Sequence, residues 1–333
     1  MRSRPLRAPS DTPTAARRFR DNAPTLAHVF VTRELPGPAL DRLRELHQVE
    51  IWPQRLPPPY DELRRRTAEA EGLLSLLTDR IDAELIDGAP ALRAISNYAV
   101  GYDNIDFQAA AARGIPVGNT PDVLTDATAD LTFALLLAAA RRLPDATASV
   151  AAGDWVTWEP GRHLGYDVHG ATLGIVGFGR IGRAVARRAE GFDMRVLTNG
   201  RGGNAGFERL LEESDFVSLH CPLTPDTRHL IDAAALDRMK STAILINTAR
   251  GPIVDPRALR WALEAGVIAG AALDVTEPEP LPAQDALLGA PNLIVAPHIG
   301  SATHSARERM SSLAVENLLA ALDGRPMPHQ VGA

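Results

Sequence analysis

Three side chains suited to proton transfer beside a bound anion stand just after three short apolar runs: Arg250, Glu279 and His298. If these runs are parallel strands of one sheet, the residues past their carboxyl ends face a common crevice. An arginine offers a fork of donors to a carboxylate or a keto oxygen. A histidine can protonate a developing alkoxide, and a carboxylate on its other ring nitrogen favours the protonated ring. The three residues therefore suit a reaction of a 2-keto acid, with Arg250 as anchor, His298 as acid and Glu279 as its partner.

Each of these assignments has an alternative at the level of sequence. An arginine after a strand is often a surface or domain-contact residue. Glu279 lies in a Glu-Pro-Glu-Pro run, in which Glu277 is an alternative partner for the histidine. The chain has nine histidines, and three others compete for the role of the acid: His163, His220 and His304.

A glycine-rich run over residues 177–182, GFGRIG, has the G-x-G-x-x-G spacing of dinucleotide-binding folds. It follows the apolar run Thr172–Val176 and opens a helical segment, which is the context that gives the motif meaning. Gly177 is expected to make the tight turn, Gly179 to admit a pyrophosphate and Gly182 to allow close helix–strand packing. The helix N-terminus then faces the phosphates with free amide groups.

The segment that would contact the adenosine ribose contains no acidic residue. NAD-specific folds usually carry Asp or Glu about 20 residues into the motif, but this chain has Thr-Asn-Gly-Arg at residues 198–201. The missing carboxylate removes repulsion toward a 2′-phosphate, and Arg201, next to Gly200, can supply a positive charge. The sequence therefore favours NADP(H). In the alternative interpretation Arg201 is a solvated turn residue and NAD(H) can serve as the cofactor.

Strands alternating with helices predict two βαβ series and parallel sheets. The helix over Asp126–Arg142, capped by Thr125 or Asp126, is apolar on nearly every face, so we expect it to be buried between domains or subunits. Strands are expected at His28–Thr32, Gly72–Leu77, Leu92–Ser96, Val117, Thr172–Val176, Met194–Leu197, Phe216–Leu219, Ala243–Ile246, Ala271–Leu273 and Leu293–Val295. Further helices are expected at Gly37–Leu46, Arg180–Ala189, Ala258–Ala265 and Thr303–Leu322.

Bulk properties exclude several classes of protein. The 333 residues fit two domains, and the net charge of -6 argues against a nucleic-acid partner. The single cysteine, Cys221, allows no internal disulfide and no thiolate metal cluster, which favours the cytoplasm. No apolar run is long enough for a membrane helix, and no metal site is expected. Residues 1–25 are arginine- and proline-rich and are expected to form a disordered tail, with a transit peptide as the alternative.

Residues 27 to 330 resemble the D-isomer-specific 2-hydroxyacid dehydrogenases. The motifs that carry the resemblance are VGYDNID at 100–106, GFGRIG at 177–182, NTARGPIVD at 247–255, LDV at 273–275 with Glu279 following, and PHIGS at 297–301. Within that family the chain most resembles the glyoxylate/hydroxypyruvate reductase branch, through GLLSLLTDRID at 72–82, NTPDVLTDATAD at 119–130 and HIGSATH at 298–304.

The resemblance implies a fold, a reaction and an assembly. The fold would be α/β, with a Rossmann cofactor domain (125–303) inserted into a discontinuous flavodoxin-like substrate domain (26–124 and 304–333). The reaction would be NADPH-dependent reduction of small 2-keto acids, glyoxylate to glycolate and hydroxypyruvate to D-glycerate. The assembly would be a homodimer formed through the cofactor domain, with the long helix from Asp126 at the interface. Trp158 would approach the neighbouring active site or simply pack in the interface.

The resemblance also assigns residue roles. It implies Arg250 for the substrate carboxylate, Glu279 as the partner of the histidine and His298 as the acid/base. It places the backbone of Val100 and Gly101 at the substrate carboxylate. Around the cofactor it implies Thr125, Gly177, Gly179, Arg180, Ile181, Gly182, Gly200, Arg201, Pro222, Thr248, Asp274 (on the nicotinamide carboxamide) and Gly300.

One segment departs from the family pattern. Between Arg201 and Phe207 the family has about ten more residues, forming a short helix and an outer strand near the adenosine. Only five residues remain here, so we expect a more open adenosine pocket. The alternatives to the reductase are another D-2-hydroxyacid dehydrogenase that uses NAD and a non-catalytic, dinucleotide-sensing binding module.

Overall fold

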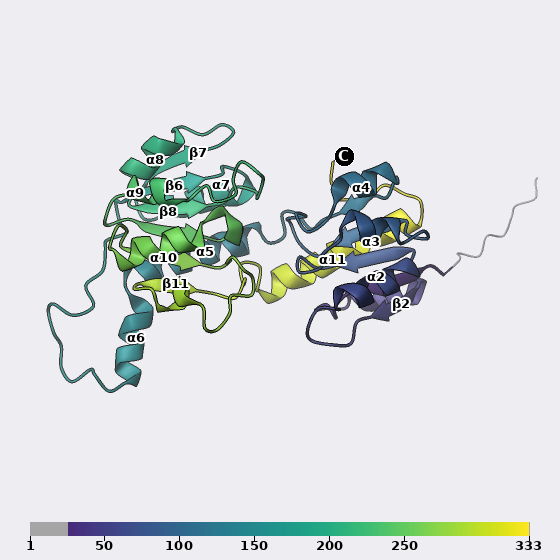
Figure 1. The fold of residues 1–333 in the computed structure, drawn as a ribbon, viewed down its shortest axis with the longest axis horizontal. Coiled ribbons are helices and arrows are strands. Elements are labelled where there is room, and N and C mark those ends of the chain that lie inside the picture. The colour runs from purple at the N-terminus through teal and green to yellow at the C-terminus, as the bar shows by residue number, and fades with distance from the viewer. Residues whose placement is uncertain (1–25, 333) are drawn as a thin grey trace, which may run out of the picture.

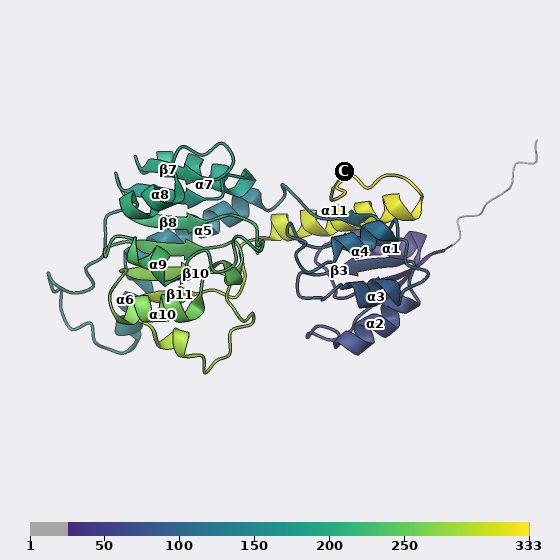
Figure 2. The ribbon, with the colours of Figure 1, turned by 45° about the horizontal axis from the view of Figure 1, so that its top comes forward.

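The computed structural model describes residues 26–332, and the tail expected at residues 1–25 lies outside them. The chain forms two lobes that lie side by side (Figures 1 and 2). One lobe, the terminal lobe, contains the strands between His28 and Gly118 and the helix His304–Leu322; the other, the central lobe, contains the strands between Thr172 and Val295. Each lobe is built on one sheet of parallel strands, which confirms the predicted fold class.

The terminal lobe has a five-stranded sheet in the order β2-β1-β3-β4-β5, the flavodoxin-like order. Helices α1 and α11 cover one face of the sheet through one apolar cluster, and α2, α3 and α4 cover the other face through a second. The strands are β1 (His28–Val31), β2 (Gln48–Ile51), β3 (Gly72–Ser75), β4 (Ala94–Asn97) and β5 (Val117–Gly118). The helices are α1 (Ala39–Leu46), α2 (Tyr60–Ala68), α3 (Ala83–Asp87), α4 (Phe107–Ala112) and α11 (His304–Leu322).

The central lobe has a six-stranded sheet in the order β11-β10-β9-β8-β6-β7. Helices α5 and α7 pack on one face, and α8, α9 and α10 pack on the other. The strands are β6 (Thr172–Val176), β7 (Arg195–Asn199), β8 (Phe216–Leu219), β9 (Ile244–Asn247), β10 (Gly270–Leu273) and β11 (Leu293–Val295). The helices are α5 (Thr125–Ala140), α6 (Leu143–Ala151), α7 (Arg180–Glu190), α8 (Phe207–Glu213), α9 (Ala233–Asp237) and α10 (Pro256–Glu264), with short 3-10 turns at Gly251–Ile253 and Ala286–Gly289.

The shortened segment after β7 leaves that strand at the edge of the sheet. The standard dinucleotide-binding order has one more strand outside this position, and within residues 26–332 no strand pairs there. Asn204 forms hydrogen bonds with some of the backbone groups at this edge. Its side-chain oxygen accepts from the Thr198 backbone N–H at 2.8 Å, and its amide donates to the Val196 carbonyl at 3.2 Å. One asparagine thus replaces part of a strand's hydrogen bonding.

The long helix α5 differs from its prediction in two respects. It begins at Thr125 after Leu124, and no side chain caps its first turn. Its buried side chains are covered by α7 and by the sheet of the central lobe, which corrects the expectation of burial between domains; the alternative, burial between subunits, stays a prediction. The alanine- and leucine-rich sequence fits a helix with neighbours on most sides. No helix in residues 26–332 is both long and apolar enough to span a membrane.

The two lobes are joined where β5 leads into α5 and where the loop before α11 returns to the terminal lobe (Figure 1). Thr303 caps α11 by accepting from the Ala306 N–H at 3.1 Å. At the first crossing Asp122 has a left-handed φ of 70° and pairs with Arg180 of α7 at 2.8 Å. One crossing is therefore fixed by the cap at the start of α11, and the other by the ion pair of Asp122 with Arg180.

Candidate active site

A cleft of about 620 Å³ lies where the two lobes meet, at the carboxyl ends of strands from both sheets. Its size is within the roughly 300–1,000 Å³ typical of ligand sites. Most of the site residues predicted from the sequence line it: Val100, Gly101, Thr125, Gly179, Arg180, Ile181, Pro222, Thr248, Arg250, Asp274, His298 and Gly300. The predicted residues outside the lining are Gly177, Gly182, Gly200, Arg201 and Glu279.

His298 and Glu279 are brought together across 19 residues of sequence, with His298 Nδ1 and Glu279 Oε1 2.6 Å apart. Both side chains are partly exposed, at 24% and 33% respectively. A carboxylate on Nδ1 fixes the imidazole so that Nε2 carries the exchangeable proton. This contact fixes the orientation of the imidazole ring at the rim of the cleft.

The loop that carries His298 is held by Asp274. The Asp274 carboxylate accepts from the backbone N–H of Ile299 and of Gly300, both at 2.7 Å, and its carbonyl accepts from His298 N–H at 2.8 Å. His298 has a left-handed φ of 55°, a conformation that costs a non-glycine residue about 1 kcal/mol or more. These three bonds offset that cost. Burial raises the pKa of Asp274, and the two amide bonds lower it by less.

Arg250 reaches across the lobes to Asp103. Its Nε lies 3.0 Å from Asp103 Oδ1 and 3.2 Å from Oδ2, and its Nη1 donates to the Ala249 carbonyl at 2.8 Å. Gly101 lies against the guanidinium, because a Cβ there would come 2.7 Å from Cζ of Arg250 and closer still to Nη2. A glycine is therefore required for the arginine to occupy this position beside the backbone of residues 100 and 101.

The glycine run forms the turn expected of a phosphate-binding loop. Gly177 has a φ of 96°, and a Cβ there would collide with the backbone of His220 and Cys221. Helix α7 begins at Arg180 with no side-chain cap, so the amide groups of its first turn are available to an anion. The Cβ position of Gly179 has no atom within 4 Å. This open cradle at a helix N-terminus fits a dinucleotide pyrophosphate.

The competing residues make other contacts. Glu277 pairs with Arg228 and, at 2.7 Å, with His229, and burial raises its pKa less than these hydrogen bonds lower it. His220 lines the cleft, but burial lowers its pKa to about 3, so its ring is neutral. The remaining two competitors do not line the cleft: His163 bonds to Ser149, and His304 is exposed at the start of α11.

Several cleft residues were not predicted from the sequence. The charged examples are Asp103 beside Arg250, Asp122 where β5 leads into α5, and Arg307 on α11. Asp103 stands in the VGYDNID run, so its position in that motif was a usable signal. The other unpredicted members are Leu77, Ala99, Tyr102, Pro121, Leu124, Thr128, Cys221, Leu223, Thr224, Ala249, Ser301 and Met310.

Comparison with known proteins agrees with this geometry. The family model for the D-isomer specific 2-hydroxyacid dehydrogenase NAD binding domain matches residues 133–300. A glyoxylate reductase of Korarchaeum cryptofilum is 51% identical over 315 residues, covering 91% of this chain and 95% of that protein. A glyoxylate reductase of Thermococcus litoralis is 49% identical over 318 residues, covering 91% and 96%.

Solved structures show the same fold. A protein from Thermus thermophilus superposes with a TM-score of 0.87 at 51% identity, covering 91% of this chain and 99% of that one. An NADPH-dependent glyoxylate/hydroxypyruvate reductase from Sinorhizobium meliloti, in complex with NADP and malonate, gives 0.82 at 33% identity, covering 92% and 97%.

The parallel sheets, the glycine turn and the cleft, together with these matches, define a nicotinamide dinucleotide-dependent oxidoreductase. The chain belongs to the D-isomer specific 2-hydroxyacid dehydrogenase family. Within the family it groups with the glyoxylate reductases.

Proposed function

We propose that this protein reduces glyoxylate to glycolate and hydroxypyruvate to D-glycerate with NADPH. The observation that carries the proposal is the 2.6 Å contact of Glu279 with His298, which lines the same cleft as Arg250. The glyoxylate reductases of K. cryptofilum and T. litoralis support the choice of substrate.

The residues of the cleft have distinct roles in this reaction. Arg250 binds the substrate carboxylate through the guanidinium nitrogen that neither Asp103 nor the Ala249 carbonyl uses, and the backbone of Val100 and Gly101 lies at the same carboxylate. When bound, the dinucleotide supplies the hydride that adds to the keto carbon. His298 donates the Nε2 proton to the keto oxygen as negative charge develops there. Before this transfer, Glu279 stabilises the protonated ring through Nδ1.

A steady-state comparison of glyoxylate, hydroxypyruvate and larger 2-keto acids, each with NADPH and with NADH, tests the reaction. His298→Ala is expected to abolish reduction while the cofactor still binds. Reduction that persists in this variant at neutral pH contradicts the role of His298. Cofactor titration without turnover of any 2-keto acid favours the second candidate, a dinucleotide-sensing binding module.

The preference for NADPH rests on the end of β7, where Gly200 and Arg201 follow the strand without a carboxylate. Arg201 is exposed, and a Cβ at the following Gly202 would have no atom within 4 Å. Arg201→Ala is expected to weaken NADPH binding much more than NADH binding. Arg195→Ala, on the same strand and paired with Glu213, is the control. Equal weakening of both cofactors by Arg201→Ala contradicts the phosphate contact.

We also propose a homodimer in the cytoplasm, formed through the central lobe. Helix α6 and the loop after it protrude from that lobe (Figure 1), and no residue of α6 is buried. The loop exposes Trp155, Val156 and Trp158, and such a patch indicates a protein contact.

Light scattering on the purified protein tests the dimer. Trp158→Ala is expected to raise the KM of the keto acid several-fold in an intact dimer. Unchanged kinetics would indicate that Trp158 only packs in the dimer interface.

A further inference from the structure

A second cavity, of about 760 Å³, lies in the terminal lobe at the carboxyl ends of β1, β2, β3 and β4. Three arginines line it, Arg33 after β1, Arg55 after β2 and Arg307 on α11. We name it the arginine pocket. Its walls are otherwise mostly apolar, from Leu35, Pro36, Ile51, Trp52, Pro53, Leu76 and Tyr98. The proposed function assigns no role to this cavity.

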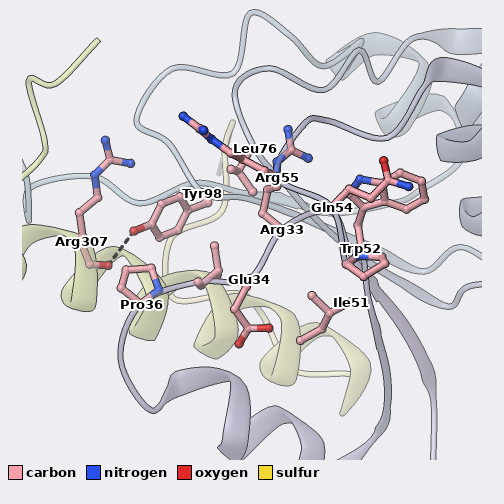
Figure 3. A pocket seen from close by; sticks show the side chains of 12 residues that line it. Arg33, Glu34, Pro36, Ile51, Trp52, Gln54, Arg55, Leu76, Tyr98 and Arg307 are labelled. Carbon is pink, nitrogen blue, oxygen red and sulfur yellow. Dashed lines mark hydrogen bonds between the residues drawn. The ribbon is translucent and has the colours of Figure 1, made fainter. Parts of the chain in front are cut away.

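The arginine pocket has an excess of positive charge. Figure 3 shows the three guanidinium groups on one side of the pocket and the Glu34 carboxylate pointing the other way. Glu34, the one acidic residue of the lining, lies 3.5 Å from Arg44 of α1. Within residues 26–332, Arg55 and Arg307 have no carboxylate partner within 4.0 Å. These two charges are therefore available to a bound anion.

The third arginine is held in place by its own lobe. Arg33 is only 13% exposed, donates to the Thr32 carbonyl at 2.6 Å and lies 4.0 Å from the buried Asp79 carboxylate. Asp79 offsets part of its charge but also fixes its position. Arg307 lies over the Tyr98 ring, with Cζ 6.0 Å from the centroid. Two of the three guanidinium groups are thus oriented before any ligand binds.

The arginine pocket adjoins the active-site cleft. Arg307 lines both cavities, and Leu76 and Tyr98 of the pocket are followed in the chain by Leu77 and Ala99 of the cleft. Arg250, the proposed anchor of the first carboxylate, lines the same cleft as Arg307, so Arg307 connects that cleft with the arginine pocket. Planar guanidinium forks match the geometry of carboxylates and phosphates.

We propose that the arginine pocket binds the distal carboxylate or phosphate of 2-keto acids longer than glyoxylate. The inference rests on the proposed function and extends its substrate class to anionic 2-keto acids. The apolar side chains accommodate the methylene groups, and the arginines recognise the terminal charge. Neutral 2-keto acids of equal length lack that second contact.

A matched pair of five-carbon substrates tests the inference: 2-oxoglutarate carries a distal carboxylate, and 2-oxopentanoate ends in a methyl group. Glyoxylate, which has no distal group, is the reference in every preparation. Arg55→Gln is expected to weaken the apparent binding of 2-oxoglutarate, measured as its KM, about 10-fold, the scale of one charge-assisted contact. The same variant should change 2-oxopentanoate and glyoxylate less than about 2-fold. Arg42→Gln, exposed on α1 outside the pocket, is the control.

Inorganic phosphate distinguishes a substrate subsite from a site for free anions. Phosphate is expected to compete with 2-oxoglutarate and not with glyoxylate, and to lose this effect in Arg55→Gln. Phosphate that binds without competing with either substrate, or that inhibits both equally, overturns the inference. So does an equal response of both five-carbon substrates to Arg55→Gln. Glyoxylate turnover in the same preparations shows whether the proposed function itself holds.

Discussion

Gly101→Ala is expected to disable the site while leaving the fold intact. A methyl carbon at this position would lie 2.7 Å from Cζ of Arg250 and 2.9 Å from Oδ1 of Asp103, and closer still to Nη2 of Arg250. The nearest atoms belong to the end of a long, flexible side chain, which can yield without moving the backbone. The substitution should therefore displace the guanidinium rather than unfold the lobe.

The size of the effect follows from the distances. Ordinary contact begins near 3.4 Å, so Cζ has to move by about 0.7 Å and Nη2 further, and a displacement near 1 Å costs about 100-fold in rate. We expect kcat/KM for glyoxylate to fall about 100-fold, equivalent to about 2.7 kcal/mol. The Kd of the cofactor and the melting temperature should change little.

Steady-state kinetics, cofactor titration and thermal melting of purified variants test this expectation. Gly289→Ala is the matched control, because its Cβ position has no atom within 4 Å. If alanine acts through Arg250, adding Gly101→Ala to Arg250→Ala should lower the rate by less than about 3-fold, since residues of one unit are not additive. A kcat/KM within about 3-fold of wild type in Gly101→Ala, or full additivity in the double variant, refutes the reasoning.

Three further outcomes are expected. Glu279→Gln should lower kcat for reduction about 100-fold or more, because it removes the carboxylate charge that lies beside Nδ1 of His298. An unchanged kcat contradicts a catalytic role for this pair. Phe216→Ala, in the buried strand β8, should lower the free energy of unfolding by about 3–5 kcal/mol in denaturant titrations, whereas a loss below about 1 kcal/mol would count against tight packing there. Burial lowers the pKa of His220 to about 3, below its unfolded value near 6.5, so the stability from its neutral ring is complete above pH 6.5 and is lost as the pH falls toward 3. Wild type should lose up to about 1.4 kcal/mol more per pH unit than His220→Gln in that window, and parallel curves would contradict the assignment.

The buried strands could be predicted because an apolar run of four or five residues between turn signals is typical of a strand that is covered on both faces. β8 and β9 have every residue buried and follow their predictions closely. β2 was not predicted, because Gln48-Val49-Glu50-Ile51 is an edge strand with no fully buried residue. It lacks the continuous apolar run that marked the buried strands, although its four residues alternate between polar and apolar. Short helices such as α3, α8 and α9, with five to seven residues, are also too brief for a helical period to be visible.

The site was only partly accessible from sequence. The residues at strand ends could be proposed because parallel strands present their carboxyl ends to one crevice. The contact of Arg250 with Asp103 joins residues 147 positions apart, and no spacing rule reaches that far. The left-handed backbone of His298 has no sequence signal either, since it depends on the bonds that Asp274 makes to the following loop.

Helix α11 has a consequence for how the chain folds during synthesis. It supplies Ala306, Met310, Ala314, Val315, Leu318, Leu319 and Leu322 to the cluster that covers one face of the terminal-lobe sheet. The central lobe is continuous in sequence and can fold as soon as it leaves the ribosome. The first five strands emerge before the central lobe, yet the face of their sheet that α1 covers in part stays incomplete until α11 appears. This part of the terminal lobe is therefore made before the central lobe and completed after it, so it exposes apolar surface for longer on the nascent chain.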